Sequence, residues 1–549
     1  MTERPAPVLN DDYYLVNFHT IASFVVSTYH DLLTHDEQQW FEKIRTVSKP
    51  AQRLYIRLLT RRGSSFRIAK LCYPEIERIG TAADELSAVA LAEREAPQDD
   101  KLLLSCFTKP ELIERLELQH LRKLSRVELI AHIESSTQAQ LAQYRKHLQS
   151  EQWITLVGHA HWMLMQLCFF GNLYQDSSEL VLRQLGTLTY EDYPLDATAR
   201  AFTSRDQIDA HWRYFECETL YDCADKSNAR TLLTLAYSVP TVDSGDTTLC
   251  RRLDRIRNRI ARQLERLGSI EEAERLYELS EHPPARERRV RIKLARQQWQ
   301  TASLLAKEMI QTPYDEAEKL TARKLLLKCQ KAQGLPAAST RLFKPAATKL
   351  VLRSDGSRVE ELARRFYTRK GVCFHTENTL VNGVLGLFIW DIIFHPVPGV
   401  FFNPYQIAPA DFNEPEFQTR RAELLKQRFE ELTDPISFGP RIHQNYAQHV
   451  GKMNPLVRWQ RLSPEMLALA IDRIGLNHWR ALFERILLDK RENRSGLPDL
   501  VLFPDDGGYE FIEIKGPGDT LQANQRRWMQ YFDQHSIACR LVHVRYTSK

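Results

Sequence analysis

The sequence of 549 residues is poor in the features that mark secreted, zinc-bound or membrane proteins. Its nine cysteines are scattered and form no C-x-x-C pair, which argues against a structural zinc site and favours reduced thiols. No uncharged apolar run is long enough to span a bilayer, and the first residues lack the apolar stretch of a signal peptide. The net charge of +5 neither requires nor excludes an anionic partner. We expect a cytoplasmic protein with no membrane partner.

A basic and aromatic segment lies near the N-terminus, where residues 51–71 read AQRLYIRLLTRRGSSFRIAKL. Cations beside aromatic side chains suit a nucleic-acid backbone. A charged face exposed only to solvent explains the pattern equally well. The candidate DNA contacts here are Arg57, Arg61, Arg62, Arg67 and Lys70.

Two capping boxes follow, one at Thr108 with Glu111 and one at Ser125 with Glu128. Each begins a short amphipathic helix, and the linker between the helices carries Arg122 and Lys123. This arrangement resembles the SAP module, a small DNA-binding helical hairpin, and a plain helical hairpin is the alternative.

The middle of the chain, residues 140–350, is predicted to be almost wholly helical. Two segments place a small alanine three residues after a bulky one, as Ile270 with Ala273 and Trp299 with Ala302. That spacing is typical of the second helix of a tetratricopeptide-like hairpin, so we expect an α-solenoid. Arg255 and Arg259 lie on an arginine-rich helix that is either a phosphate track or a charged outer face.

Near the C-terminus, residues 496–516 read GLPDLVLFPDDGGYEFIEIKG, a pattern of two strands around a turn. Symmetric pairing places residue 503 opposite 509 and Asp499 opposite Glu513, with Cβ atoms roughly 5 Å apart. A bulge would shift this register by one residue. Lys515 lies on the same strand face as Glu513.

Two opposed carboxylates repel each other unless a divalent cation makes both of them ligands. A lysine beside them can orient an attacking water or stabilise charge that builds on a phosphate. The set suits phosphodiester hydrolysis better than glycoside hydrolysis, which needs a separated acid and base and no metal. The alternative is a turn-capping Asp499 and the polar face of an exposed strand.

The P-D…E-x-K hairpin resembles the PD-(D/E)xK nuclease superfamily. Gln525 and Trp528 in the next helix resemble its VRR-NUC branch, and the segment FHTENTLVNGVLGLFIWDIIF resembles the helix that supplies a further glutamate, Glu377. With the N-terminal segment, the chain is similar over nearly its whole length to the bacterial Fanconi-associated nucleases. The resemblance implies metal ligation by Glu377, Asp499, Glu513 and the carbonyl of Ile514, catalysis by Lys515, and support from Gln525.

The same resemblance implies a structure-specific nuclease that incises near 5′ flaps, degrades DNA from 5′ to 3′ and acts in interstrand crosslink repair. It implies one or two Mg²⁺ or Mn²⁺ ions, branched or flapped double-stranded DNA as the partner, and no nucleotide cofactor. The Cys/His spacing of a ubiquitin-binding zinc finger is absent from this sequence, so ubiquitin binding is not expected. In a bacterium, such a protein would be cytoplasmic and associated with the nucleoid.

The expected fold is an α-rich multidomain chain that ends in an α/β nuclease domain with a mixed central sheet. We expect four parts: a basic helical DNA-binding region (1–100), a SAP-like hairpin (101–150), a TPR-like repeat region (151–355) and a VRR-NUC domain (356–549). Two rival functions are a Holliday-junction resolvase and a non-catalytic DNA-binding scaffold. Resolvases of this type tend to be short and dimeric, and a scaffold has no need of the four site residues Glu377, Asp499, Glu513 and Lys515.

Overall fold

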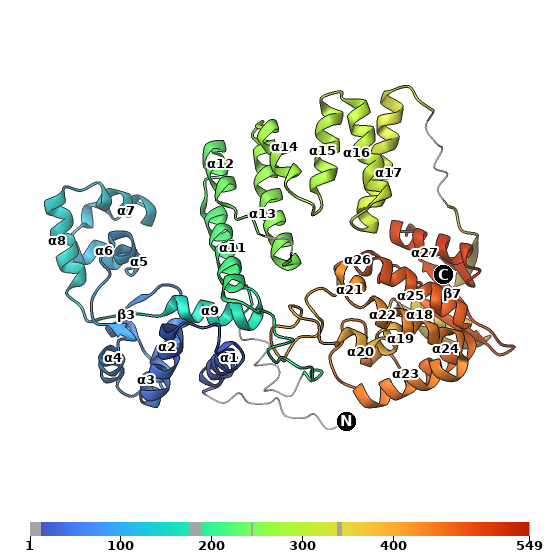
Figure 1. Ribbon diagram of the computed structural model, residues 1–549, viewed down its shortest axis with the longest axis horizontal. Coiled ribbons are helices and arrows are strands. Elements are labelled where there is room, and N and C mark those ends of the chain that lie inside the picture. Colours follow the sequence, from blue (N-terminus) through green and yellow to red (C-terminus); the bar gives the residue numbers. More distant parts are fainter. Residues whose placement is uncertain (1–11, 176–187, 243–244, 337–342, 548–549) are drawn as a thin grey trace. The chain divides into compact units, whose positions relative to one another are not determined.

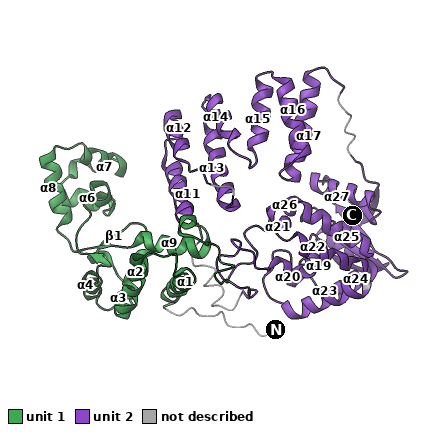
Figure 2. Ribbon diagram, in the orientation of Figure 1, with its two compact units in different colours: residues 1–187, 195–208 green, residues 188–194, 209–549 purple. Residues whose placement is uncertain are grey.

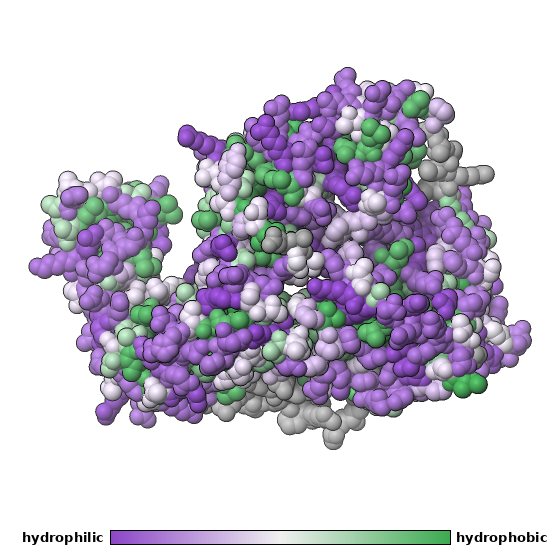
Figure 3. Space-filling view, in the orientation of Figure 1, coloured by the Kyte–Doolittle hydropathy of each residue, from purple (hydrophilic) through white to green (hydrophobic). Residues whose placement is uncertain are grey.

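The computed structural model describes residues 12–175, 188–242, 245–336 and 343–547. The chain divides into two compact units, residues 1–187 with 195–208 and residues 188–194 with 209–549 (Figures 1 and 2). Helices dominate both units, and the surface seen in Figure 3 is largely hydrophilic, with small separate hydrophobic patches. None of the described helices combines the length and the apolar content needed to cross a membrane.

The first unit combines helices with a small antiparallel sheet in the order β1-β3-β2. The sequence predicts helix from residue 140 and the repeat region from residue 151, but Trp153–Leu156 forms strand β3 and pairs Thr155 with Ser65. That part of the prediction is wrong, because the buried strand completes the N-terminal sheet. The elements are α1 (Tyr13–Tyr29), α2 (His35–Thr46), α3 (Lys49–Leu59), β1 (Ser65–Arg67), α4 (Ile79–Ala88), β2 (Ala92–Glu93), β3 and α9 (His159–Phe170).

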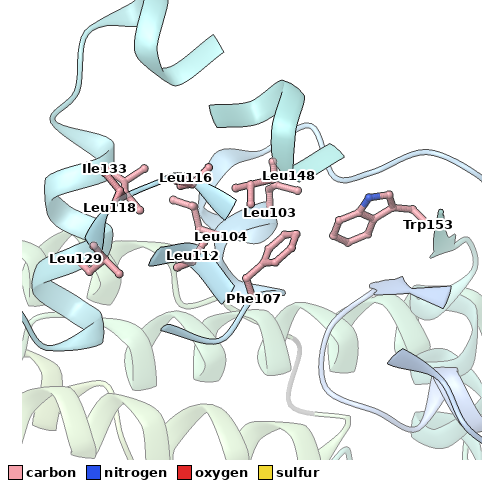
Figure 4. Packing of buried hydrophobic residues seen from close by; sticks show 10 residues of the cluster. All are labelled: Leu103, Leu104, Phe107, Leu112, Leu116, Leu118, Leu129, Ile133, Leu148 and Trp153. Carbon is pink, nitrogen blue, oxygen red and sulfur yellow. The ribbon is translucent and has the colours of Figure 1, made fainter. Parts of the chain in front are cut away.

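A helical hairpin within this unit has its own hydrophobic core (Figure 4). Both predicted capping boxes are present, at the starts of α6 and α7. Leu112 and Leu129, one from each helix, are fully buried and join the same cluster, as the amphipathic spacing predicts. The elements are α5 (Asp100–Ser105), α6 (Lys109–Arg115), α7 (Arg126–Glu134) and α8 (Gln138–Gln149).

The repeat region consists of successive antiparallel helices, which lie in the second unit except for the first residues of α11 (Figure 1). Ala273 on α14 and Ala302 on α16 are both fully buried, so each allows the close helix approach that its spacing predicts. The elements are α11 (Arg205–Cys223), α12 (Ala229–Ser238), α13 (Thr247–Arg266), α14 (Ile270–Glu278), α15 (Ala285–Ala295), α16 (Trp299–Gln311) and α17 (Glu316–Ala332).

The C-terminal domain is built on a mixed five-stranded sheet in the order β4-β8-β7-β6-β5. Strand β4 pairs in parallel with β8, so the domain includes residues 347–352 and the predicted boundary at 356 falls too late. Helix α18 covers the sheet face of Ile512 and Ile514, and α27 stacks Phe532 on Phe511 of the other face. The sheet and its flanking helices are β4 (Ala347–Leu352), α18 (Val359–Tyr367), β5 (Gly371–His375), β6 (Leu500–Pro504), β7 (Glu510–Lys515), α27 (Ala523–Gln534) and β8 (Cys539–Tyr546).

A helical insertion separates β5 from β6. Its helix α19 carries Gly383 and Gly386 against the segment that includes Val457 and Leu462. A Cβ on either glycine would lie under 3.0 Å from that segment, so the glycines permit close packing. The elements are α19 (Leu380–Phe388), α20 (Trp390–Ile393), α21 (Glu416–Thr419), α22 (Ala422–Glu430), α23 (Pro435–His449), α24 (Pro464–Arg473), α25 (Leu476–Leu488) and α26 (Lys490–Asn493).

Candidate active site

The β6–β7 hairpin places two acids at one end of the sheet. The strands pair Leu500 with Ile512 and Leu502 with Glu510, which is the predicted register. Asp499 directly precedes β6, and its Oδ2 accepts a hydrogen bond of 2.8 Å from the backbone N–H of Ile514. The Asp499 carboxylate is therefore held beside the strand that carries Glu513.

Glu513 and Lys515 project from β7 and are both buried. Glu513 is only 1% exposed, and its Oε1 lies 2.7 Å from the Lys515 ammonium. The ion pair confirms that both side chains lie on one face of the strand, as the alternation predicts. A structural alternative with an exposed polar face is excluded, because both side chains are removed from solvent.

Burial and mutual repulsion disfavour the charged forms of the two acids. Burial, followed by the charge of Asp499, raises the pKa of Glu513 to about 8. Burial also raises the pKa of Asp499 to about 6, with smaller contributions from Glu360 and Glu377. Lys515 opposes both shifts but does not cancel them. The site carries an excess of negative charge that a cation would relieve.

Glu377 lies in the turn between β5 and α19. The expectation that the helix itself carries Glu377 is wrong, because α19 begins only at Leu380. The backbone N–H groups of Thr376 and Glu377 donate to the carbonyl oxygen of Asp499 at 2.8 and 3.2 Å. The Glu377 side chain is 51% exposed and lies 3.9 Å from the Arg461 guanidinium. The fold thus brings Glu377 to Asp499, although 122 positions separate them in the sequence.

The loop before Asp499 is fixed by one side chain from a helix and one from the turn that carries Glu377. Trp528 of α27 is buried, and its Nε1 donates to the carbonyl oxygens of Asn493 and Ser495 at 3.2 and 3.1 Å. Asn378 accepts a 3.0 Å hydrogen bond from the N–H of Leu497. Sequence reasoning noted Trp528 only through a resemblance and missed Asn378. Its positive φ of 62° is a conformation that asparagine adopts more readily than most residues, so the residue type was the one available signal.

Gln525 lies at the third position of α27. Its Oε1 accepts a 3.0 Å hydrogen bond from the N–H of Gln522 and completes a capping box. This contact gives the side chain a structural task at the helix start. The role of Gln525 as a supporting residue near the scissile phosphate stays a prediction.

The candidate metal donors at the site are the oxygens of Asp499, Glu513, Glu377 and the Ile514 carbonyl. Oxygen-only sets suit Mg²⁺ and Mn²⁺. Within the described residues, no three acid, histidine or cysteine side chains converge closely enough to hold an ion as they stand.

Among the predicted DNA contacts near the N-terminus, Arg67 and Arg57 are the least exposed and are engaged within the fold. Arg67 is 6% exposed, pairs with Glu111 and Glu151, and stacks over the ring of Phe107. Its prediction as a DNA contact is wrong, because the guanidinium ties β1 to the helical hairpin. Arg57 is half-buried, pairs with Glu75 at 2.8 Å and covers the ring of Tyr14.

The remaining candidate DNA contacts in the first unit are exposed to solvent. Arg61 and Arg62 are exposed, and Lys70 is exposed but pairs with Glu111 at 2.8 Å. Arg122 and Lys123 are exposed in the linker of the hairpin. Their role in DNA binding stays a prediction.

Arg255 and Arg259 on α13 each form an ion pair with a carboxylate, so this helix is not a row of unpaired cations for phosphate binding. The Arg255 guanidinium lies 3.5 Å from Glu414 of the C-terminal domain. Arg259 pairs with Glu218 and Asp222 at 3.1 and 2.7 Å. Any phosphate bound here would have to compete with these acids.

A hairpin with opposed acids and a lysine at the end of a mixed sheet defines the class of PD-(D/E)xK nucleases. Comparison with known proteins agrees: the family model "FAN1, HTH domain" matches residues 12–93, and the model "VRR-NUC domain" matches residues 437–546. The chain is 32% identical to the "Fanconi-associated nuclease 1 homolog" of Pseudomonas aeruginosa, over 97% of this chain and 96% of that protein. It is 25% identical to the homolog of Arabidopsis thaliana, over 94% of this chain and 65% of that protein.

Solved structures give the same result. The chain is similar to the "crystal structure of paFAN1 bound to 2nt 5'flap DNA with gap", with a TM-score of 0.81, 31% identity and coverage of 99% of this chain and 100% of that chain. A second paFAN1 structure, bound to 1nt 5'flap DNA with gap, gives a TM-score of 0.78 at 30% identity. The chain belongs to the Fanconi-associated nuclease family, and it is a DNA-hydrolysing enzyme.

The raised pKa values predict how pH affects the stability of the cation-free protein. The carboxyls of Asp499 and Glu513 titrate near 3.8 and 4.5 when unfolded and near 6 and 8 when folded. Between its unfolded and folded pKa, each carboxyl binds a proton more readily in the folded protein. The stabilisation from these two protonated carboxyls is therefore fully present below about pH 4 and is lost as the pH rises to about 8. In Glu513→Gln, the free energy of unfolding should fall by about 1 kcal/mol or more less over this pH range than it does in wild type. Chemical denaturation at pH 5 and pH 8 in EDTA measures it, and equal losses in wild type and variant would contradict it.

Proposed function

We propose that the protein is a divalent-cation-dependent, structure-selective nuclease that incises DNA near the junction of a 5′ flap and degrades it from 5′ to 3′. The observation that carries this proposal is the buried cluster of Asp499, Glu513 and Lys515 at one end of the sheet. In the cell, the activity would serve DNA repair, including the repair of interstrand crosslinks.

The residues divide the chemistry between them. Asp499 and Glu513 would hold Mg²⁺ or Mn²⁺ with the Ile514 carbonyl, and Glu377 would hold a second ion or share the first. Bound there, the cation would neutralise charge on the phosphate and lower the pKa of water. Asp499 is oriented for this task by the Ile514 N–H, and its own carbonyl anchors the turn of Glu377.

Lys515 supplies a fixed positive charge. Its ammonium is buried and lies 2.7 Å from Glu513, so it has little freedom to move away from the site. An ammonium in a buried site stabilises developing negative charge far better than one in water. We assign to Lys515 the stabilisation of charge on the phosphate oxygens or the orientation of the attacking water.

The choice of a flapped substrate is supported by the likeness to a relative whose crystal structures contain 5′-flap DNA with a gap. This likeness covers nearly the whole chain, so it includes the helical parts as well as the catalytic domain. Recognition of DNA shape requires phosphate contacts spread over a large surface, and no base-specific contact is needed.

A panel of DNA substrates tests the proposal. End-labelled duplex, 5′-flap, 3′-flap and four-way junction DNA should be compared at equal concentration with Mg²⁺. We expect cleavage of the 5′ flap near its junction to exceed cleavage of the other forms by about tenfold or more. Preferential and symmetric cutting of the four-way junction would instead favour a resolvase.

A further inference from the structure

Three arginines are carried by segments that pack against α19, the helix that follows Glu377, and they take no part in the chemistry assigned above. Arg494 precedes Asp499 by five positions, in the loop that Trp528 fixes. Arg458 and Arg461 lie on the segment that packs against α19.

The fold fixes the backbone beneath these arginines tightly. Gly383 and Gly386 of α19 allow the segment with Val457 and Leu462 to pack at a distance that any side chain would prevent. Asn382, one position before Gly383, donates a 2.8 Å hydrogen bond from Nδ2 to the carbonyl oxygen of Arg494. The same helix therefore supports both arginine-bearing segments. It begins three residues after Glu377, which places both segments beside the site.

The charges of two of these arginines are uncompensated. Arg461 lies 3.9 Å from Glu377, whereas no carboxylate among the described residues lies within 4.0 Å of the Arg458 or Arg494 guanidinium. Arg494 is half-buried, and its pKa is lowered by burial and then by the positive charges of Arg458 and Arg491. Other arginines of the same domain differ: Arg421 pairs with Asp411 and Arg428 with Asp391. A half-buried cation without a partner is costly, and the cost disappears when an anion binds.

We propose that Arg458 and Arg494 together bind a backbone phosphate of the DNA, next to the phosphodiester that the Asp499 site cleaves. This inference rests on the proposed function. A guanidinium fits a phosphate because its N–H groups form two parallel hydrogen bonds to the oxygens. The pair acts as positioning residues: it fixes the strand so that the neighbouring phosphodiester reaches Asp499, Glu513 and Lys515. Arg461 lies near Glu377 and is not part of this pair.

The test uses Arg458→Gln, Arg494→Gln and the double variant, with Arg369→Gln as a matched control. Arg369 is exposed and precedes β5 at the end of the sheet opposite to Asp499. We expect each single variant to lose about tenfold or more in kcat/KM on 5′-flap DNA, because one charged hydrogen-bonding group is removed. The salt dependence of DNA binding should become flatter by about one in slope for the double variant. The control should cleave and bind as wild type.

Single neutral methylphosphonate linkages near the cleavage position show whether a phosphate is the partner. In wild type, one such linkage should reduce cleavage by about tenfold, and in the double variant the same linkage should have no further effect. Arg494→Lys should recover part of the loss, and thermal unfolding must confirm that all variants fold. Wild-type cleavage by the double variant, or equal sensitivity of both proteins to every linkage, would overturn the inference. An inactive wild type would instead contradict the proposed function itself.

Discussion

Replacing Asp499 with asparagine should reduce flap cleavage by about a thousandfold while DNA binding persists. The substitution removes the negative charge that a cation requires but preserves the size of the side chain. Asparagine also keeps an oxygen that can accept the hydrogen bond from Ile514 N–H. The loss should therefore lie in kcat and not in folding or binding.

Two measurements separate these effects. Single-turnover cleavage gives the rate of the chemical step, and fluorescence anisotropy with the same labelled flap gives the dissociation constant. Asp506→Asn is a suitable control, because Asp506 lies in the turn at the other end of the hairpin. Cleavage by Asp499→Asn within tenfold of wild type would contradict the assignment of Asp499 as a metal ligand.

Replacing Lys515 with methionine should reduce cleavage by about a hundredfold or more. Methionine fills a similar volume but supplies no charge, so the phosphate loses its fixed cationic neighbour. Glu513 also loses the ammonium at 2.7 Å, and its already raised pKa should rise further. The variant should consequently need a higher pH for its residual activity, because the cation binds only the deprotonated carboxylate.

The pH profile of kcat distinguishes this effect from a structural one. Lys349→Met, on the exposed strand β4, tests for a general effect of removing a lysine from the sheet. The Lys515→Met profile should move to higher pH, whereas the profile of the control should match that of wild type. A Lys515→Met variant with lower activity and an unchanged pH profile would show that the ammonium does not act on Glu513.

The hairpin was predictable because its signals are local. Alternating side chains and a turn rich in glycine and aspartate fix the register, and the register alone brings Asp499 opposite Glu513. The capping boxes and the buried alanines of the repeats are equally local, and all of them are confirmed.

The predictions that are wrong concern segments whose structure depends on contacts with distant parts of the chain. Strand β3 reads as part of a helical region until β1, some 90 residues earlier, provides its partner. Likewise, β4 becomes a strand of the catalytic domain through pairing with β8 at the C-terminus. The arginines illustrate the same limit, because Arg67 is as basic in the sequence as Arg62 yet lies buried between two acids.

Cleavage of an end-labelled 5′-flap duplex, with Mg²⁺ and separately with EDTA, tests most directly whether the hairpin is a hydrolytic site. The wild type should incise near the flap junction with Mg²⁺, and incision should stop in EDTA and in Asp499→Asn. Incision that continues in EDTA, or no cleavage of any DNA form by folded wild type with Mg²⁺, would contradict the assignment of the hairpin as a metal-dependent hydrolytic site.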